Sequence, residues 1–284
     1  MVSAKTRWAA GLSLTLVLAT ALAGCGKQAP QGGAAAKQET VTAVGSTALL
    51  PLVQAAKEDF EGKNANVTIN VSGGGSFTGL TQVANGAAQI GNSDVDVTPE
   101  LKDKGLVDHK VAVAPFLIIV NPDVNVDSLT QDQLIGIFTG KTKNWSEVGG
   151  KTEQITIIHR PGSSGSRATI KAIVLKGQEF DPSAVTQDSY GKVFDGIKST
   201  PGSIGYIDAA YLKDGVKPLA YNGVKYGLDT VTSGQYPIFA YEHMFTKGEA
   251  TGATKAFIDF IMSPDFQNAY VEKQGFVPVS KMKQ

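Results

Sequence analysis

Short apolar runs alternate along the chain with longer segments in which apolar residues recur every three or four positions. The short runs predict strands and the longer segments predict amphipathic helices. Strands are expected at 40–44, 67–71, 88–91, 155–158 and 204–207, and helices at 49–60, 76–87, after Pro99, and at 130–139, 168–174, 193–198, 255–262 and 265–273. In the second helix, Leu80, Val83 and Ala87 form the expected apolar face. This β-turn-α succession predicts an α/β fold with mainly parallel sheets flanked by helices.

Two further apolar segments are expected to cross between two lobes. Residues 107–120 are almost continuously apolar around Pro115, which predicts a strand, a break and a second strand. Residues 237–241 read as a second extended crossing. The part of the chain after position 40 has about 245 residues, which is long for one compact domain and suits two lobes. We expect one lobe from 41–114 plus 240–284 and another from 115–239, with the crossings as a hinge.

The N-terminus predicts export. A basic start at Lys5 and Arg7 precedes an apolar run that ends in Leu22-Ala23-Gly24-Cys25. This pattern is typical of a secretory signal, and its end resembles the bacterial lipobox, in which the cysteine is lipidated. An ordinary cleaved signal or an uncleaved membrane anchor is the alternative. Cys25 is the only cysteine, so no disulfide can form within the chain.

We therefore expect a signal peptide at 1–24, a lipidated (palmitate-bearing) Cys25, and a flexible Gln/Ala/Gly/Lys-rich tether over 25–40. The protein would be extracytoplasmic and lipid-anchored to the cell membrane. Without residues 1–24 the chain carries 24 basic and 26 acidic side chains. That balance argues against a nucleic-acid partner, which requires a basic face, but it does not exclude an anion held locally.

Three Gly/Ser turns at predicted helix starts carry the candidate chemistry. They are Gly45-Ser46-Thr47, Gly74-Gly75-Ser76 and Ser164-Gly165-Ser166. Unpaired N–H groups at a helix start, together with hydroxyl groups, can bind an anion. Arg160 lies just before the third turn and can balance the charge. Capping serines without a ligand are the alternative for each turn taken alone.

Other kinds of site have little support in the sequence. Neither a P-loop nor a dinucleotide fingerprint is present, and the three histidines lack metal-ligand spacing, so no cofactor or metal is expected. His159 is the nearest base for a serine nucleophile, but a packed histidine is the simpler reading. Trp145 is expected to pack rather than act. Asp94 has no obvious second carboxylate partner, although it suits a ligand that carries a proton, because a carboxylate accepts that hydrogen bond.

Five motifs in this order resemble those of the phosphate-binding proteins of bacterial phosphate ABC transporters. The resemblance runs from about Val41 to Pro278. The motifs are Val44-Gly45-Ser46-Thr47, Gly74-Gly75-Ser76, Gly91-Asn92-Ser93-Asp94, Arg160 with Ser164-Gly165-Ser166, and Pro201-Gly202-Ser203-Ile204-Gly205-Tyr206. The resemblance implies a two-lobed fold like that of periplasmic binding proteins, with two crossing strands and the ligand between the lobes.

The same resemblance implies a ligand set and a function. Phosphate contacts are implied at Thr47, the Ala48 amide, Ser76, Asp94, Arg160, Ser164, Gly165 and Ser166. A monomer of this kind would bind inorganic phosphate with high affinity and deliver it to an ABC permease for import, without catalysis. The alternatives are a secreted phosphatase or serine hydrolase that uses Ser164 or Ser166, and a binder or sensor of another oxyanion.

The sequence departs from the family pattern near the arginine. Gly162 stands where the family often has an acidic residue that pairs with the arginine, so the orienting partner of Arg160 is open. Ala48 replaces a frequent aromatic residue, and Ser166 replaces a frequent threonine while keeping the hydroxyl. Arg167 adds a charge next to the site, either as a second anion contact or as a solvated residue of the first helical turn.

Overall fold

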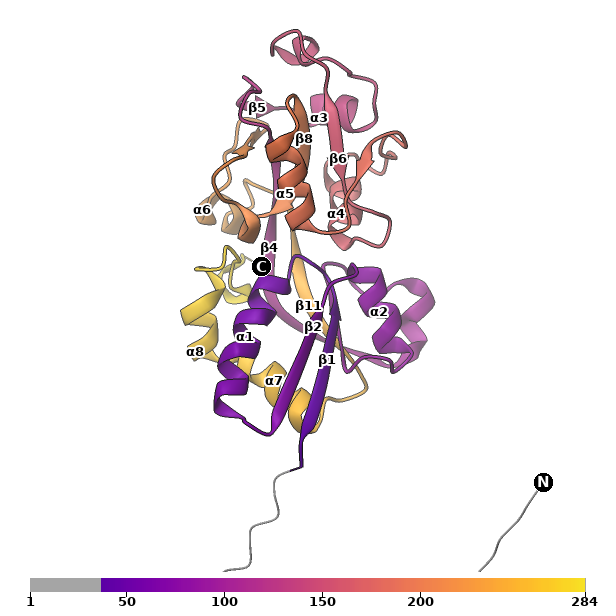
Figure 1. The fold of residues 1–284 in the computed structure, drawn as a ribbon, viewed down its shortest axis with the longest axis vertical. Helices are drawn as coiled ribbons and strands as arrows, with labels where there is room; N and C mark the ends of the chain where they lie inside the picture. The colour runs from indigo at the N-terminus through magenta and orange to yellow at the C-terminus, as the bar shows by residue number, and fades with distance from the viewer. Residues whose placement is uncertain (1–36, 284) are drawn as a thin grey trace, which may run out of the picture. The chain divides into compact units, whose positions relative to one another are not determined.

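A nine-stranded mixed sheet is the framework of the described part of the protein, residues 37–283 of a computed structural model (Figure 1). Along the sheet the strands are β2 (Val67–Ser72), β1 (Glu39–Gly45), β3 (Ile90–Ser93), β11 (Phe239–Lys247), β4 (Leu106–Val120), β8 (Ser203–Asp208), β6 (Thr156–His159) and β7 (Val185–Thr186), while β9 (Lys217–Pro218) pairs with β4. A separate small sheet joins β5 (Ser128–Leu129) to β10 (Ala220–Tyr221).

The long strand β4 belongs to both halves of this sheet. Its residues 106–115 pair with β11, and its residues 116–120 pair with β8. The expected break at Pro115 is therefore wrong, because the strand continues through the proline. Proline is tolerated where a strand does not need its N–H, and Pro115 stands where β4 changes partner. The next N–H, that of Phe116, donates to the Ile238 carbonyl at 2.8 Å.

The sheet is mixed rather than mainly parallel, which corrects the expectation. Strand β1 is parallel to β2 and β3, and β6 is parallel to β7 and β8. The long strands are the antiparallel members, since β11 pairs antiparallel with β3 and β4, and β4 pairs antiparallel with β8. The β-turn-α units form the parallel parts, and the chain runs in the opposite direction where it passes between the halves.

Most helices lie close to their predicted positions. The helices are α1 (Leu50–Lys63), α2 (Ser76–Ala84), α3 (Gln131–Phe138), α4 (Gly165–Ile173), α5 (Tyr190–Ser199), α6 (Leu228–Thr232), α7 (Gly252–Met262) and α8 (Pro264–Phe266), with 3-10 turns at Pro99–Lys104, Trp145–Val148, Ala209–Tyr211 and Val279–Lys281. The short α6 was not predicted, and the helix expected after Pro99 is a 3-10 turn. Helix α1 buries Leu52, Val53, Ala56 and Phe60, and Phe60 packs edge-on against Phe257 of α7, with ring centroids 5.3 Å apart. Ala87 lies beyond the end of α2 and is exposed, so its assignment to the apolar face was wrong.

The C-terminal helix pair is less regular than expected. Helix α8 has only three residues after Ser263 and continues as a π-helix at Gln267–Val271.

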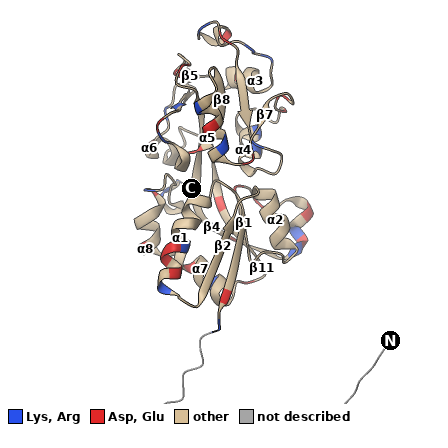
Figure 2. Cartoon of the chain, viewed as in Figure 1, with Lys and Arg blue, Asp and Glu red and all other residues tan. Residues whose placement is uncertain are grey.

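Trp145 is buried, as expected. It is 1% exposed, and its indole N–H donates to the Gly202 carbonyl at 2.9 Å, which confirms the packing role. Lys and Arg positions and Asp and Glu positions are both distributed along the ribbon of the two halves (Figure 2).

The expected signal peptide, Cys25 and most of the tether lie outside the described residues. Strand β1 begins at Glu39, so the last two residues of the expected tether are already part of the sheet. The Glu39 carboxylate accepts the N–H of Ala253 at 3.2 Å, which ties the start of the strand to helix α7. Between residues 37 and 283, no helix has the length and apolar character needed to span a bilayer.

Candidate functional site

The first Gly/Ser turn follows strand β1 and is held by β3. The Ser46 N–H donates to the Asn92 carbonyl at 2.9 Å, and a Cβ on Gly45 would lie only 2.1 Å from that oxygen. Ser46 Oγ accepts the Ala48 N–H at 3.0 Å. Thr47 is 4% exposed, and its hydroxyl has no hydrogen-bond partner within residues 37–283. The turn thus presents a buried, uncommitted hydroxyl group.

The second turn begins helix α2 and touches the other two turns. The Gly75 N–H donates to the Gly45 carbonyl at 2.9 Å, and the Phe77 N–H donates to the Ser163 carbonyl at 3.2 Å. Gly75 has φ +94°, and a Cβ there would lie 2.3 Å from the Ser163 oxygen, so the close approach requires glycine. Ser76, at the start of the helix, is fully buried.

The third turn caps helix α4 against the second. Ser164 is the N-cap residue, and its Oγ accepts the Arg167 N–H at 3.2 Å and lies 2.9 Å from Ser166 Oγ. A Cβ on Gly165 would lie 2.3 Å from Ser76 Oγ. The three turns, which are distant in the sequence, therefore meet at one place, and their amides and hydroxyls form the start of two helices there.

Arg160 is held at this place by main-chain carbonyls. Its side chain is 1% exposed, its Nε donates to the Gln187 carbonyl at 3.1 Å, and its Nη2 donates to the Asp188 carbonyl at 2.9 Å. The guanidinium carbon lies 4.8 Å from the centroid of the Tyr190 ring. These contacts replace the acidic partner that is missing at Gly162. No acidic side chain within residues 37–283 forms a salt bridge with Arg160.

Arg167 belongs to a different cluster. Its guanidinium carbon lies 4.4 Å from the Phe180 ring centroid, and its Nη1 hydrogen-bonds to His159 Nδ1. The His159 ring stacks on the same phenylalanine at 5.0 Å. Burial and the neighbouring charge of Arg167 lower the pKa of His159 to about 4. This arrangement confirms the packed reading of His159.

A serine hydrolase site is not assembled here. In the described chain His159 Nδ1 contacts the Arg160 carbonyl at 2.9 Å and the Arg167 guanidinium, and its ring makes no hydrogen bond to a serine. Ser164 and Ser166 contact each other and the start of helix α4. A serine nucleophile requires a base within hydrogen-bond reach. The geometry therefore offers hydrogen-bond donors for an anion but no activated nucleophile.

Asp94 follows strand β3 and lies between the second and third turns. It is 5% exposed, and its main-chain N–H donates to Ser76 Oγ at 2.9 Å. Burial raises the pKa of the Asp94 carboxyl, whereas a hydrogen bond from Ser46, the charge of Arg160 and a hydrogen bond from Ser76 act in the opposite direction. Its Oδ1 has no donor within the described residues.

The expectation that Asp94 has no second carboxylate nearby is wrong. Glu242 of β11 and Asp208 at the end of β8 are both fully buried and act on the same region. Glu242 is the only acidic residue in the apolar segment 237–246, and this was the signal available in the sequence. It was missed because its nearness to Asp94 depends on strand pairing.

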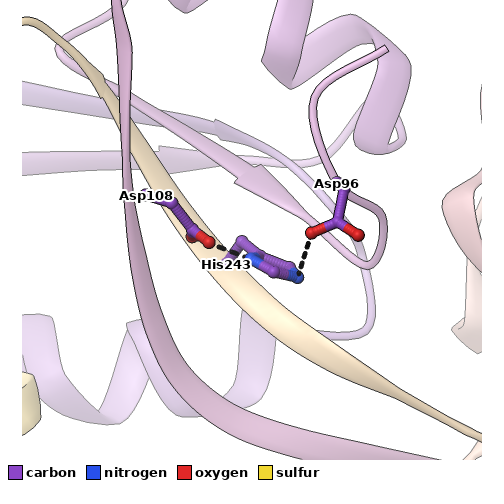
Figure 3. Close-up of side chains that lie close together, drawn as sticks. All are labelled: Asp96, Asp108 and His243. Carbon is purple, nitrogen blue, oxygen red and sulfur yellow. Dashed lines mark hydrogen bonds and ion pairs between the residues drawn. The ribbon is translucent and has the colours of Figure 1, made fainter.

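One further cluster lies near the surface on the same strand. His243 Nδ1 is 2.7 Å from Asp108 Oδ1, and His243 Nε2 is 3.7 Å from Asp96 Oδ1 (Figure 3). It is the one group in the described chain compact enough to suggest a metal. The two ring nitrogens face separate carboxylates, and the Asp96 side chain is 87% exposed, so the cluster is explained by a hydrogen bond between His243 and Asp108 and a longer polar contact with Asp96.

Comparison with known proteins places this geometry in a family. A PBP superfamily domain matches residues 30–265. The chain is 45% identical over 276 residues to the phosphate-binding protein PstS of Bacillus subtilis, covering 94% of this chain and 92% of that protein. It is 29% identical to the phosphate-binding protein PstS of Borreliella burgdorferi, covering 85% and 91% of the two chains.

A solved structure supports the same family assignment. The fold matches a putative phosphate ABC transporter substrate-binding protein with bound phosphate from Clostridium perfringens, with a TM-score of 0.81 and 30% identity, covering 84% of this chain and 99% of that one. A phosphate transport receptor from Vibrio cholerae, at 22% identity and a TM-score of 0.70, shares the fold. The described chain thus belongs to the phosphate-binding protein family of the PBP superfamily.

Proposed function

We infer that this protein binds inorganic phosphate as the extracytoplasmic component of a phosphate ABC transporter and does not act as an enzyme. The observation that carries this inference is the meeting of three hydroxyl-bearing turns beside a buried arginine that forms no salt bridge in residues 37–283. Its relatives from Bacillus subtilis and Borreliella burgdorferi are named phosphate-binding proteins. Delivery of the ligand to the permease completes the proposed role.

The proposed ligand set is the one implied by the sequence. Arg160 supplies the positive charge, and the remaining donors are hydroxyl and amide groups on the three turns and the start of α4. The set is Thr47, Ala48, Ser76, Asp94, Arg160, Ser164, Gly165 and Ser166. The unpaired Thr47 hydroxyl supports its place in the set. The Ala48 N–H donates to Ser46 Oγ, so it would have to share or release that bond to reach a ligand.

Asp94 would provide selectivity. Phosphate near neutral pH keeps a proton on at least one oxygen, whereas sulfate keeps none. An ionised carboxylate accepts hydrogen bonds only, so it can bind the proton of phosphate and repels an anion without one. Discrimination of this kind depends on repulsion of the wrong ligand as well as attraction of the right one.

Calorimetric titration of the purified protein, freed of bound ligand, tests the function. Phosphate is expected to bind, and sulfate at the same concentrations is not. Equal binding of both anions, or binding of sulfate alone, would contradict the proposal. Turnover of a phosphate ester without added metal would instead support the enzymatic reading.

We also propose that residues 41–114 with 240–284 form one lobe, that 115–239 form the other, and that β4 and the segment around Ile238 act as the hinge. The change of partner along β4 supports this division, since residues 106–115 pair with β11 and residues 116–120 pair with β8. Two hydrogen bonds join the proposed lobes, from Phe77 N–H to the Ser163 carbonyl at 3.2 Å and from Tyr211 Oη to the Thr47 carbonyl at 2.7 Å. Hinge closure is a common response to a ligand that bridges two lobes. Small-angle scattering should show a smaller radius of gyration with phosphate.

The proposed attachment to the membrane is a lipid on Cys25, which lies outside the described residues. The lipobox-like end of the apolar run supports it. A diacylglyceryl anchor holds a protein firmly, whereas a single acyl chain binds only marginally. Cys25→Ser is expected to release the protein from the membrane fraction or leave it unprocessed. An unchanged membrane fraction with normal processing would refute lipidation.

A further inference from the structure

Glu242 and Asp94 lie close together, where β11 runs past the end of β3. Strand β11 pairs antiparallel with β3, with His243 opposite Ser93 and Met244 opposite Asn92. Asp94 is the first residue after β3, and Glu242 is the residue of β11 that precedes His243, so the two residues follow the last paired position. At paired positions the Cβ atoms of neighbouring strands are about 4.5–5.5 Å apart, so carboxyl groups just beyond the last pair are within reach of a hydrogen bond. The two acids therefore lie near each other across neighbouring chain segments.

Three of the four carboxylate oxygens of this pair lack a hydrogen-bond donor within the described residues. They are the two Glu242 oxygens and Asp94 Oδ1, and all three are buried. The ligand atoms of these acids do not form a compact cation cluster, since the one such cluster in the described chain is at Asp96, Asp108 and His243. Two buried carboxylates with neither a donor nor a cation between them cannot both be charged at low cost. A shared proton is the simplest group that satisfies the facing oxygens.

The surroundings indicate which member of the pair holds the proton. Ser46, Arg160 and Ser76 all favour the ionised form of Asp94. Burial and the neighbouring acids Asp94 and Asp208 raise the pKa of Glu242 well above its ordinary value, and no neighbour lowers it. One oxygen of Asp208 is engaged, because its Oδ1 accepts the Ala210 N–H at 2.6 Å, whereas its Oδ2 has no donor among the described residues.

We propose that Glu242 is a positioning residue of the ligand site: it stays protonated, and its O–H donates a hydrogen bond to the Asp94 carboxylate, so that the pair carries one negative charge. The donated bond fixes the Asp94 carboxylate and leaves its other oxygen to accept the proton of a bound phosphate. This role rests on the proposed phosphate function. It adds a residue of the second crossing strand to the three turns and the arginine, and thereby couples the site to the strand that passes between the halves.

Two variants of Glu242 and one control test this role. Glu242→Gln keeps a neutral donor of the same shape, so phosphate affinity should stay within about threefold of the parent. Glu242→Met keeps the length but removes the donor, so phosphate affinity should fall at least about tenfold, which is about 1.4 kcal/mol. Sulfate affinity, measured by displacement, should change little, because sulfate receives no bond from Asp94. Asp208→Asn is the matched buried-acid control and should leave the phosphate-to-sulfate ratio unchanged.

Infrared spectroscopy detects the protonated carboxyl group of Glu242 directly, and this measurement does not require Glu242→Met to fold. The ligand-free parent should show the C=O stretching band of a protonated carboxylic acid, and a difference spectrum should assign part of that band to Glu242 through its loss in Glu242→Gln. No such loss would overturn the proposal. A change in phosphate affinity above tenfold in Glu242→Gln, or an equal loss of phosphate and sulfate binding in Glu242→Met, would also overturn it. If the parent fails to bind phosphate, the proposed function fails, while the infrared result still decides whether Glu242 is protonated.

Discussion

Replacement of Arg160 by alanine is the most direct test of the candidate site. The side chain is 1% exposed, and no acid in the described chain forms a salt bridge with it. A bound anion would therefore lose its nearest full positive charge. Removing one partner of a buried, hydrogen-bonded charge pair costs about 2–5 kcal/mol. At 1.4 kcal/mol per factor of ten, phosphate affinity should fall about 30-fold to 4,000-fold.

The same change also affects stability, and the size of that effect can be bounded. Arg160→Ala leaves the carbonyls of Gln187 and Asp188 without their donors. An unsatisfied buried polar group costs about 1–3 kcal/mol, so the melting temperature should fall while the fold persists. Phosphate binding has to be measured well below the lowered melting temperature.

Arg167→Ala is the matched control. Arg167 lies seven residues from Arg160 in the sequence, but its guanidinium packs on Phe180 and bonds to His159 rather than facing the three turns. This variant should lose some stability and keep its phosphate affinity within about threefold. Isothermal titration of both variants and thermal unfolding by circular dichroism provide the data. Parent-like binding by Arg160→Ala together with lost binding by Arg167→Ala would refute the assignment of the cation.

Three further predictions follow from the geometry. Asp94→Asn should keep phosphate affinity within about tenfold but weaken the rejection of sulfate in competition titrations, and an unchanged ratio would remove Asp94 from the site. Gly165→Ala should weaken phosphate binding in calorimetry, because its Cβ would lie 2.3 Å from Ser76 Oγ, whereas Gly62→Ala, with nothing within 4 Å of the new Cβ, should bind like the parent. The pKa of His159 is lowered to about 4 in the folded protein, so as the pH falls the His159 imidazole of the unfolded chain is protonated first. Stability present above pH 6.5 is then lost as the pH falls toward 4, by about 2 kcal/mol at pH 5, and urea unfolding of His159→Asn should lack this part of the loss.

The local elements of this protein were determined by the sequence. Hydrophobic spacing located α1, and its apolar residues, which recur every three or four positions, are the ones that the fold buries. The Gly/Ser turns were located as well, because glycine at positive φ and serine at a helix start act within a few residues of themselves. The motif order identified the family before any geometry was known. Each of these features depends on interactions between residues that are close along the chain.

Tertiary structure alone decided how these elements serve the site. Pro115 ends no strand, because β4 changes partner at that residue. Arg160 needs no acid at Gly162, because the carbonyls of Gln187 and Asp188 approach it from another segment.

Glu242 is the clearest example of a role that depends on tertiary structure. It reads in the sequence as a single acid in an apolar strand, and it becomes the neighbour of Asp94 only through the register of β11 on β3. Pairing between distant strands depends on which partners and registers the whole fold allows, and hydrophobic spacing within one strand does not specify its partner. The burial that raises the pKa of a carboxyl group likewise exists only after the two halves of the protein pack around it.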